Sequence, residues 1–135
     1  MDNFDFVAHL ADTASALDAS VEVVESYLRS YYQEMHASTA KWSSRCAGDH
    51  QLLDQAFSEL KGIYQKYWLA DTRFTEYWQP ALAPPEEYII IDGGITIFSD
   101  MLGNFVALVR TAERTPVYLL SVVRDELKIV NKFFR

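Results

Sequence analysis

Apolar and polar residues alternate along the C-terminal part of the chain, from Asn104 to Phe134. Three alternating segments, 105–109, 117–123 and 127–134, are separated by short polar turns. A period of two residues is typical of strands with one buried face, and short turns join antiparallel neighbours. The pattern therefore predicts a three-stranded antiparallel meander in this part of the chain.

Two further apolar segments, 88–92 and 95–98, flank Gly93 and Gly94. Asp-Gly-Gly supplies the positive φ angles that a tight primed turn requires, so this stretch predicts a β-hairpin. With the meander, the sequence predicts five strands.

The N-terminal half follows a helical period instead. Apolar residues recur from Phe6 to Leu17 after the candidate N-cap Asp5, which predicts a first short helix ending at about Asp18. Ser20 is the candidate cap of a second helix. The apolar stripe of that helix consists of Val21, Val24, Leu28, Tyr31 and Met35.

A third helix is expected to start near Asp49. Its apolar face consists of Leu53, Phe57, Leu60, Tyr64, Tyr67 and Trp68. The pattern weakens over residues 37–48, where a short helix at 41–46 is one reading, and residues 71–87 fit either a helical turn or a strand before a proline-rich loop. Helices followed by strands indicate an α+β fold with N-terminal helices on a curved antiparallel sheet, in a single domain of residues 1–135.

The net charge of −7 is unevenly distributed along the chain. Residues 1–109 hold 6 basic and 16 acidic side chains, whereas residues 110–135 hold 6 basic and 3 acidic ones. Nucleic-acid affinity depends on clustered Lys and Arg, so nucleic acid is not expected as a partner. Lys128, Lys132 and Arg135 could form a small basic strip, but alternating lysines on a terminal strand more often keep a sheet face or edge in solution.

The sequence also predicts a cytoplasmic protein without a membrane segment. Its apolar runs are far shorter than the roughly 20 residues that span a bilayer, and the first residues lack the features of a secretory signal. A lone cysteine, Cys46, cannot form a disulfide within the chain.

Residues 95–110 and 117–134 resemble the end of nuclear transport factor 2-like domains, in particular the SnoaL-like and lumazine-binding-like branch. The resemblance depends mainly on the ending Lys128-Ile-Val-Asn-Lys-Phe-Phe134, although Leu127 stands where the family usually has Trp and Glu126 where it often has Gly. It covers about the last 40 residues well.

This resemblance implies a cone in which a curved sheet wraps a long helix and leaves an open end lined by apolar and aromatic side chains. Family members are isomerases, dehydratases, hydrolases or binding proteins, and some pair through the sheet as dimers. The middle of the chain departs from the family, because residues 48–69 form one helical pattern where members usually have a short helix, two strands and another helix. No position therefore inherits a catalytic role.

Aromatic residues, 14% of the chain, are the most suggestive material for a ligand site. A flat, apolar ligand could stack on them while a phenol or indole nitrogen orients it, although aromatics at helical spacing more often fill a core or an interface. The expected ligand contacts are Tyr31, Tyr77, Trp78 and Tyr118, of which Tyr77 and Trp78 lie beside the proline-rich loop.

Three residues are candidates for acid or base chemistry: Asp92, Glu76 and His36. Each has a simpler interpretation, since Asp92 favours a turn, Glu76 suits solvent and His36 suits a helix C-terminus. Arg110 could face an anion, but an edge or solvent position fits it better.

Metal binding and covalent catalysis have little support. His9, His36 and His50 are scattered, and the pair Cys46 and His50 lacks the further ligands that zinc requires. No base is fixed beside Cys46, and neither a dinucleotide fingerprint nor a phosphate-binding glycine loop occurs. No cofactor or metal is expected.

The preferred hypothesis is a protein that holds a small apolar or aromatic molecule in a cone-shaped pocket. One alternative is a small isomerase, dehydratase or hydrolase that uses a pocket carboxylate or His36 as base and a tyrosine as hydrogen-bond donor. Another is a homodimeric interaction module, and a homodimer is compatible with all three hypotheses.

Overall fold

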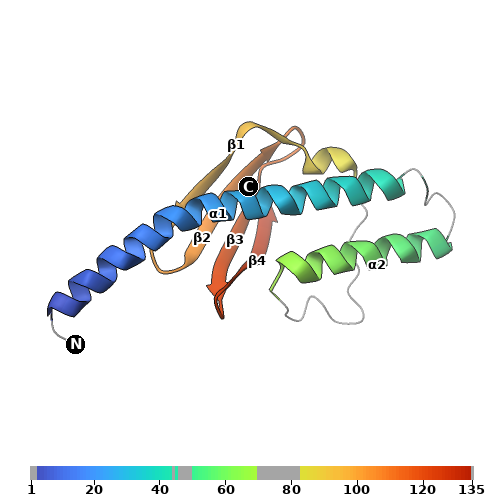
Figure 1. The fold of residues 1–135 in the computed structure, drawn as a ribbon. Coiled ribbons are helices and arrows are strands. Elements are labelled where there is room, and N and C mark those ends of the chain that lie inside the picture. Colours follow the sequence, from blue (N-terminus) through green and yellow to red (C-terminus); the bar gives the residue numbers. More distant parts are fainter. Residues whose placement is uncertain (1–2, 44, 46–49, 70–82, 135) are drawn as a thin grey trace.

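The structure is a computed structural model that describes residues 3–43, 45, 50–69 and 83–134, with side chains described from Val21 onward. The described elements are two α-helices, one 3-10 helix and four strands. They are α1 (Asn3–Ser43), α2 (His50–Tyr67), η2 (Pro85–Tyr88), β1 (Ile90–Ser99), β2 (Asn104–Thr111), β3 (Pro116–Val123) and β4 (Glu126–Phe134). Figure 1 shows α1 crossing one face of the sheet and α2 beside the C-terminal half of α1. The predicted α+β class is confirmed.

The four strands form one antiparallel sheet in the order β1-β2-β3-β4. The last three correspond to the predicted meander, which is confirmed. Arg124 and Asp125, which join β3 to β4, have φ angles of 51° and 64°. Positive φ at both central residues is the geometry of a two-residue primed turn, whose twist matches that of the strands.

The predicted hairpin of segments 88–92 and 95–98 is wrong, because both apolar segments belong largely to the single strand β1. Ile90 and Ile95 pair with positions of β2 that are only two residues apart, so the residues between them form a bulge. Gly93, with a φ of 64°, supplies the positive angle inside this bulge rather than in a turn. The described sheet therefore has four strands instead of the predicted five.

The predicted break between two helices at Asp18 and Ser20 is also wrong, since α1 continues through both positions to Ser43. No glycine or proline interrupts residues 3–43, so a residue able to cap a helix is tolerated within one. The separate short helix considered at 41–46 is likewise absent as such, because α1 includes its first half.

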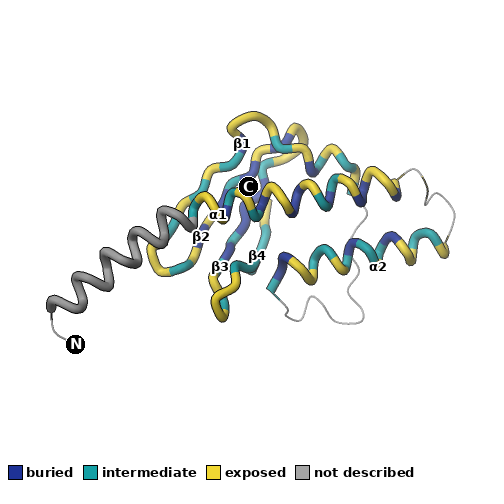
Figure 2. Tube along the Cα trace, in the orientation of Figure 1, coloured by how far each residue is buried: buried dark blue, intermediate teal, exposed yellow. Residues whose placement is uncertain are grey.

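The hydrophobic core lies between α1 and the sheet. Four members of the predicted stripe are at most 1% exposed: Val24, Leu28, Tyr31 and Met35. Opposite them, the helix-facing side of the sheet contributes Phe105, Ala107, Val109, Tyr118, Leu120 and Ile129. Figure 2 shows buried positions recurring along the helices and strands, while most of the described turns are exposed.

The third predicted helix is confirmed as α2, and two polar contacts attach it to α1. Lys66 forms an ion pair with Glu34 at 3.1 Å, and the Trp42 indole nitrogen donates to a Glu59 carboxylate oxygen at 2.6 Å. Beyond the end of α2, the Leu69 backbone N–H donates to a β4 carbonyl at 2.8 Å. These contacts fix α2 against both the first helix and the last strand.

Of the region left open by the sequence, residues 70–82 lie outside the described part of the chain, and residues 85–88 form η2. None of the described helices is long and apolar enough to cross a membrane.

Candidate functional site

Tyrosine side chains from three elements meet in the hydrophobic core. Tyr31 and Tyr32 come from α1, Tyr88 from η2 and Tyr118 from β3. The hydroxyl groups of Tyr32 and Tyr118 are hydrogen-bonded at 2.9 Å. The rings pack edge to face, with centroids 5.5 Å apart for Tyr32 and Tyr88 and 6.3 Å apart for Tyr31 and Tyr118. This arrangement is favourable for aromatic quadrupoles and orders the cluster.

Burial raises the pKa of every tyrosine in this region above the ordinary value of 10.0, because a phenolate would be poorly solvated there. The affected residues are Tyr31, Tyr32, Tyr64, Tyr88 and Tyr118. The negative charge of Glu87 contributes to the raised pKa of Tyr32, Tyr64 and Tyr88. The hydroxyls are therefore neutral hydrogen-bonding groups at neutral pH.

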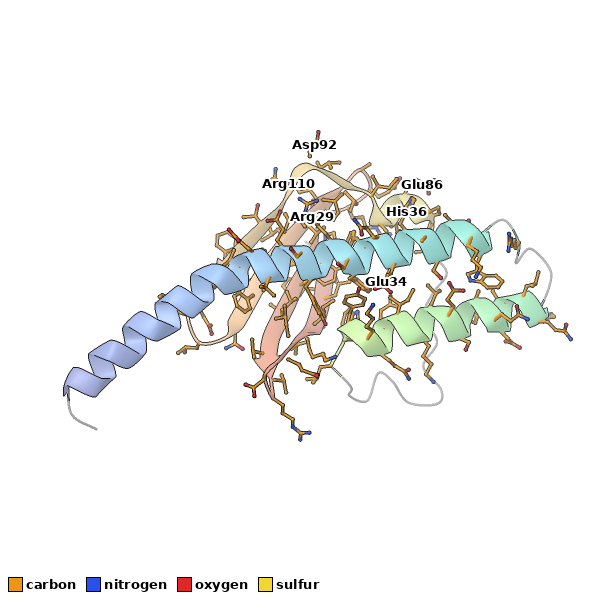
Figure 3. The ribbon with its side chains drawn as sticks, viewed as in Figure 1. Arg29, Glu34, His36, Glu86, Asp92 and Arg110 are labelled. Atoms are coloured by element: carbon orange, nitrogen blue, oxygen red, sulfur yellow. The ribbon has the colours of Figure 1, made fainter. Side chains whose placement is uncertain are left out.

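A groove of about 340 Å³ opens between α1 and the segment that leads from η2 into β1. We call it the α1–η2 groove. It is lined by Arg29, Tyr32, Gln33, His36, Tyr88, Ile89 and Ile90. Figure 3 shows Arg29 and His36 on the edge of α1 that faces η2 and β1, and Glu34 on the opposite edge, toward α2. The groove combines an aromatic and aliphatic side with a polar side.

Two of the predicted ligand contacts, Tyr31 and Tyr118, are fully buried in the core at 0% exposure. Neither lines the α1–η2 groove, although Tyr118 is bonded to Tyr32, which does. The other two, Tyr77 and Trp78, lie outside the described residues. A ligand contact by any of the four stays a prediction.

The candidate acid and base residues lie apart. His36 lines the α1–η2 groove beside Tyr32, whereas Asp92 is exposed at the bulge of β1. Arg110 is exposed on β2. Glu76 lies outside the described residues.

A tyrosine bonded to a carboxylate does occur, but away from this groove. The Tyr67 hydroxyl donates to Glu34, and Lys66 forms an ion pair with the same carboxylate. Burial and the negative charge of Glu34 both raise the pKa of Tyr67. Because the side chains of Glu34 and Lys66 are 38% and 61% exposed, we interpret this group as a contact that joins α1 to α2 rather than as a catalytic pair.

Within the part of the chain that the structure describes, no three His, Cys, Asp or Glu side chains come close enough to hold a metal ion. His36 and His50 are on different helices, and Cys46 is outside the described residues.

Sequence reasoning selected Tyr31 but did not select Tyr32 and Tyr88, which line the groove. Tyr32 lies one position beyond the apolar stripe of α1, and Tyr88 directly follows the proline-rich stretch. The sequence shows both positions, but it does not show that they meet. Only the packing of η2 against α1 brings Tyr32 and Tyr88 into one groove.

No family model matches the chain, and no curated protein or solved structure matches it either. The geometry of the described residues is therefore the basis of the proposed function.

Proposed function

We propose that this protein binds a small, largely apolar or aromatic molecule in the α1–η2 groove. The observation that carries the proposal is the ordered aromatic pair Tyr32 and Tyr88, which lines a groove of about 340 Å³ next to the polar side chains of α1. Ligand sites typically occupy roughly 300–1,000 Å³ and combine apolar walls with a few fixed polar groups. The groove lies at the small end of this range and suits a molecule with one or two rings.

The polar side of the groove suggests that the ligand also carries an anionic or hydrogen-bond-accepting group. Arg29, Gln33 and His36 recur every three or four residues, so they lie along one edge of α1. Two nitrogens of Arg29 donate to the same oxygen of Glu25, at 3.3 and 3.0 Å. This pair is exposed, so a ligand anion can compete with Glu25 for the guanidinium at little cost.

The arrangement of α1 on the sheet also supports a binding function. A long helix packed on a four-stranded antiparallel sheet is compatible with the cone expected from the nuclear transport factor 2-like resemblance. We propose that the α1–η2 groove is the accessible part of such a cone, at the edge of its tyrosine-rich interior. No catalytic step is proposed, because no carboxylate of the described residues lines the groove and His36, which does, makes no hydrogen bond to a tyrosine of the described residues.

Binding of the fluorescent dye 1-anilinonaphthalene-8-sulfonate, an aromatic anion, tests the site. The dye should bind with increased emission, and Gln33→Trp should weaken its binding because the indole occupies the groove. Ser26→Trp is the matched control, since Ser26 is an exposed residue of α1 that lines a different hollow. Equal weakening by both variants, or weakening by Ser26→Trp alone, would place the dye elsewhere and refute the proposal.

A second candidate function is self-association through the face of the sheet that points away from α1. Phe98, Val106 and Phe133 are 58%, 36% and 48% exposed. Phe98 and Val106 also line a hollow of about 430 Å³ together with Leu119 and Val130. Exposed apolar side chains on neighbouring antiparallel strands suit a two-fold contact in which the same surface covers itself.

Sedimentation analysis tests the second candidate. The protein should sediment as a dimer, and Val106→Asp should convert it to a monomer, because two carboxylates would then be buried in the contact. Ile91→Asp is the control, since Ile91 is 44% exposed but lies at the β1 bulge. A monomeric parent protein would exclude this candidate.

A further inference from the structure

Lys132 occupies an unexpected position on β4. It pairs with Tyr118 of β3, and directly paired residues of antiparallel strands point to the same face of a sheet. Tyr118 faces α1, because its hydroxyl is bonded to Tyr32. The side chain of Lys132 therefore lies on the face of the sheet that α1 covers, although β4 is an edge strand of the described sheet.

A second cation contacts the same aromatic ring as Lys132. The Lys132 Nζ is 5.1 Å from the centroid of the Phe134 ring, and the Arg114 guanidinium carbon is 4.7 Å from the same centroid. The Lys132 Nζ is also 5.5 Å from the centroid of the Tyr118 ring. Aromatic rings attract cations through their negative faces, so these contacts hold both charged groups around one side chain.

Among the described residues, the Lys132 ammonium and the Arg114 guanidinium make no ion pair and no hydrogen bond. Burial lowers the pKa of Lys132, the charge of Glu87 opposes this effect, and the charge of Arg114 makes a smaller contribution that lowers the pKa. Two cations around one aromatic ring, one of them largely buried, favour an anion that can accept hydrogen bonds from both.

We propose that Lys132 and Arg114 form an anion-binding site at this end of the sheet, for a small oxyanion such as a carboxylate or phosphate group. The planar guanidinium of Arg114 can donate two parallel hydrogen bonds to such a group, and the ammonium of Lys132 supplies a third donor. Arg114 is exposed, so the anion reaches the site from solvent. Neither residue lines the α1–η2 groove, and the site does not depend on the function proposed for that groove.

Inorganic phosphate and acetate are the probes, each compared with sodium chloride at equal ionic strength. Binding is followed by the NMR shifts of the Lys132 side chain. Phosphate should shift these resonances saturably and should raise the measured pKa of Lys132, because binding and protonation are linked. Binding of acetate as well would support a general oxyanion site, and binding of phosphate alone would narrow the site to phosphate groups.

Three variants locate the binding. For Arg114→Met, followed at the Lys132 resonances, and Lys132→Met, followed at the Phe134 ring resonances, phosphate affinity should fall about tenfold or more. Lys128→Met is the control, because Lys128 is on the same strand but donates to the Lys66 carbonyl and pairs with Glu126. Arg114 is exposed, so its replacement tests the site even if Lys132→Met perturbs folding.

Shifts no larger than those in chloride would overturn the proposal, and so would equal loss of affinity in Lys128→Met. Gln33→Trp, which fills the α1–η2 groove, should leave phosphate binding unchanged. A failure of the ligand-binding proposal and a failure of the anion-site proposal are therefore distinguished, because each is tested by different variants.

Discussion

The hydrogen bond between the Tyr32 and Tyr118 hydroxyls, 2.9 Å long and buried, provides a sharp test of the core arrangement. Tyr32→Phe removes one partner and leaves the Tyr118 hydroxyl buried beside an apolar ring, and Tyr118→Phe does the reverse. A buried polar group that loses its partner costs about 1–3 kcal/mol, so each single variant should lose about 1–2 kcal/mol of unfolding free energy. The double variant leaves no orphaned hydroxyl and should cost about as much as one single variant, far less than their sum.

Urea unfolding followed by circular dichroism measures all four free energies. The expected coupling between the two sites is about 1–2 kcal/mol. Tyr27→Phe provides the control, because the Tyr27 hydroxyl donates to the Tyr67 backbone carbonyl at 2.6 Å and shares no hydrogen bond with Tyr32. Its effect should add to that of Tyr32→Phe. Additive losses for Tyr32→Phe and Tyr118→Phe, within about 0.5 kcal/mol, would show that the two hydroxyls do not interact and would refute the arrangement.

Three other outcomes follow from the structure. Gly94→Ala should destabilise the protein by more than about 2 kcal/mol in urea unfolding, because a Cβ there would lie 2.5 Å from one backbone oxygen and 2.9 Å from another. Gly62→Ala, in the interior of α2 with no atom within 4 Å of an added Cβ, should stabilise the protein by about 0.5–1 kcal/mol. If both variants changed the unfolding free energy in the same direction, the bulge at Gly94 would be contradicted. The buried tyrosines should show no phenolate absorbance until the protein unfolds. Their folded pKa values are raised, so their contribution to stability is complete below pH 10.0 and is lost as the pH rises above it. Burial opposes ionisation of Glu59, but hydrogen bonds from Trp42 and Lys41 lower its pKa below the ordinary value of 4.5. The free energy of unfolding should therefore fall as the pH drops below 4.5 and Glu59 is protonated. This acid-dependent loss of unfolding free energy should be smaller in Glu59→Gln. An unchanged dependence of the unfolding free energy on pH would contradict the hydrogen bonds of Glu59 to Trp42 and Lys41.

Local patterns were sufficient to predict the meander and α2. The turn between β3 and β4 contains only two residues, and alternation continues on both sides of it. The hairpin predicted at Gly93 and Gly94 is wrong because a positive φ, which Gly93 adopts, serves a tight turn and a bulge equally well. The pairing of β1 along most of β2 decides between them, and this information is not local.

The continuity of α1 shows the same limit for helices. Asp18 is the predicted end of one helix and Ser20 the predicted cap of the next, but a capping side chain does not by itself end a helix. The structure continues the helix through both positions, and from Val21 the same stripe is packed against the sheet. Burial of the stripe residues Val24 and Leu28 supplies more free energy than the cap, at about 1.5–3 kcal/mol for each large side chain against about 1 kcal/mol.

The candidate site separates two neighbouring tyrosines of α1, Tyr31 and Tyr32. Successive helical residues are rotated by about 100°, so Tyr31 in the middle of the stripe is directed into the core, while Tyr32 reaches the border between core and solvent. Tyr31 is 0% and Tyr32 2% exposed, yet only Tyr32 lines the α1–η2 groove. Choosing aromatic residues by type could not separate these two roles. The position of Tyr88 could not be deduced either, because η2 rather than the helical period brings it against Tyr32. A residue adjacent to a buried stripe, facing an irregular segment that returns to the helix, is therefore a better candidate for ligand contact than the largest aromatic residue within the stripe.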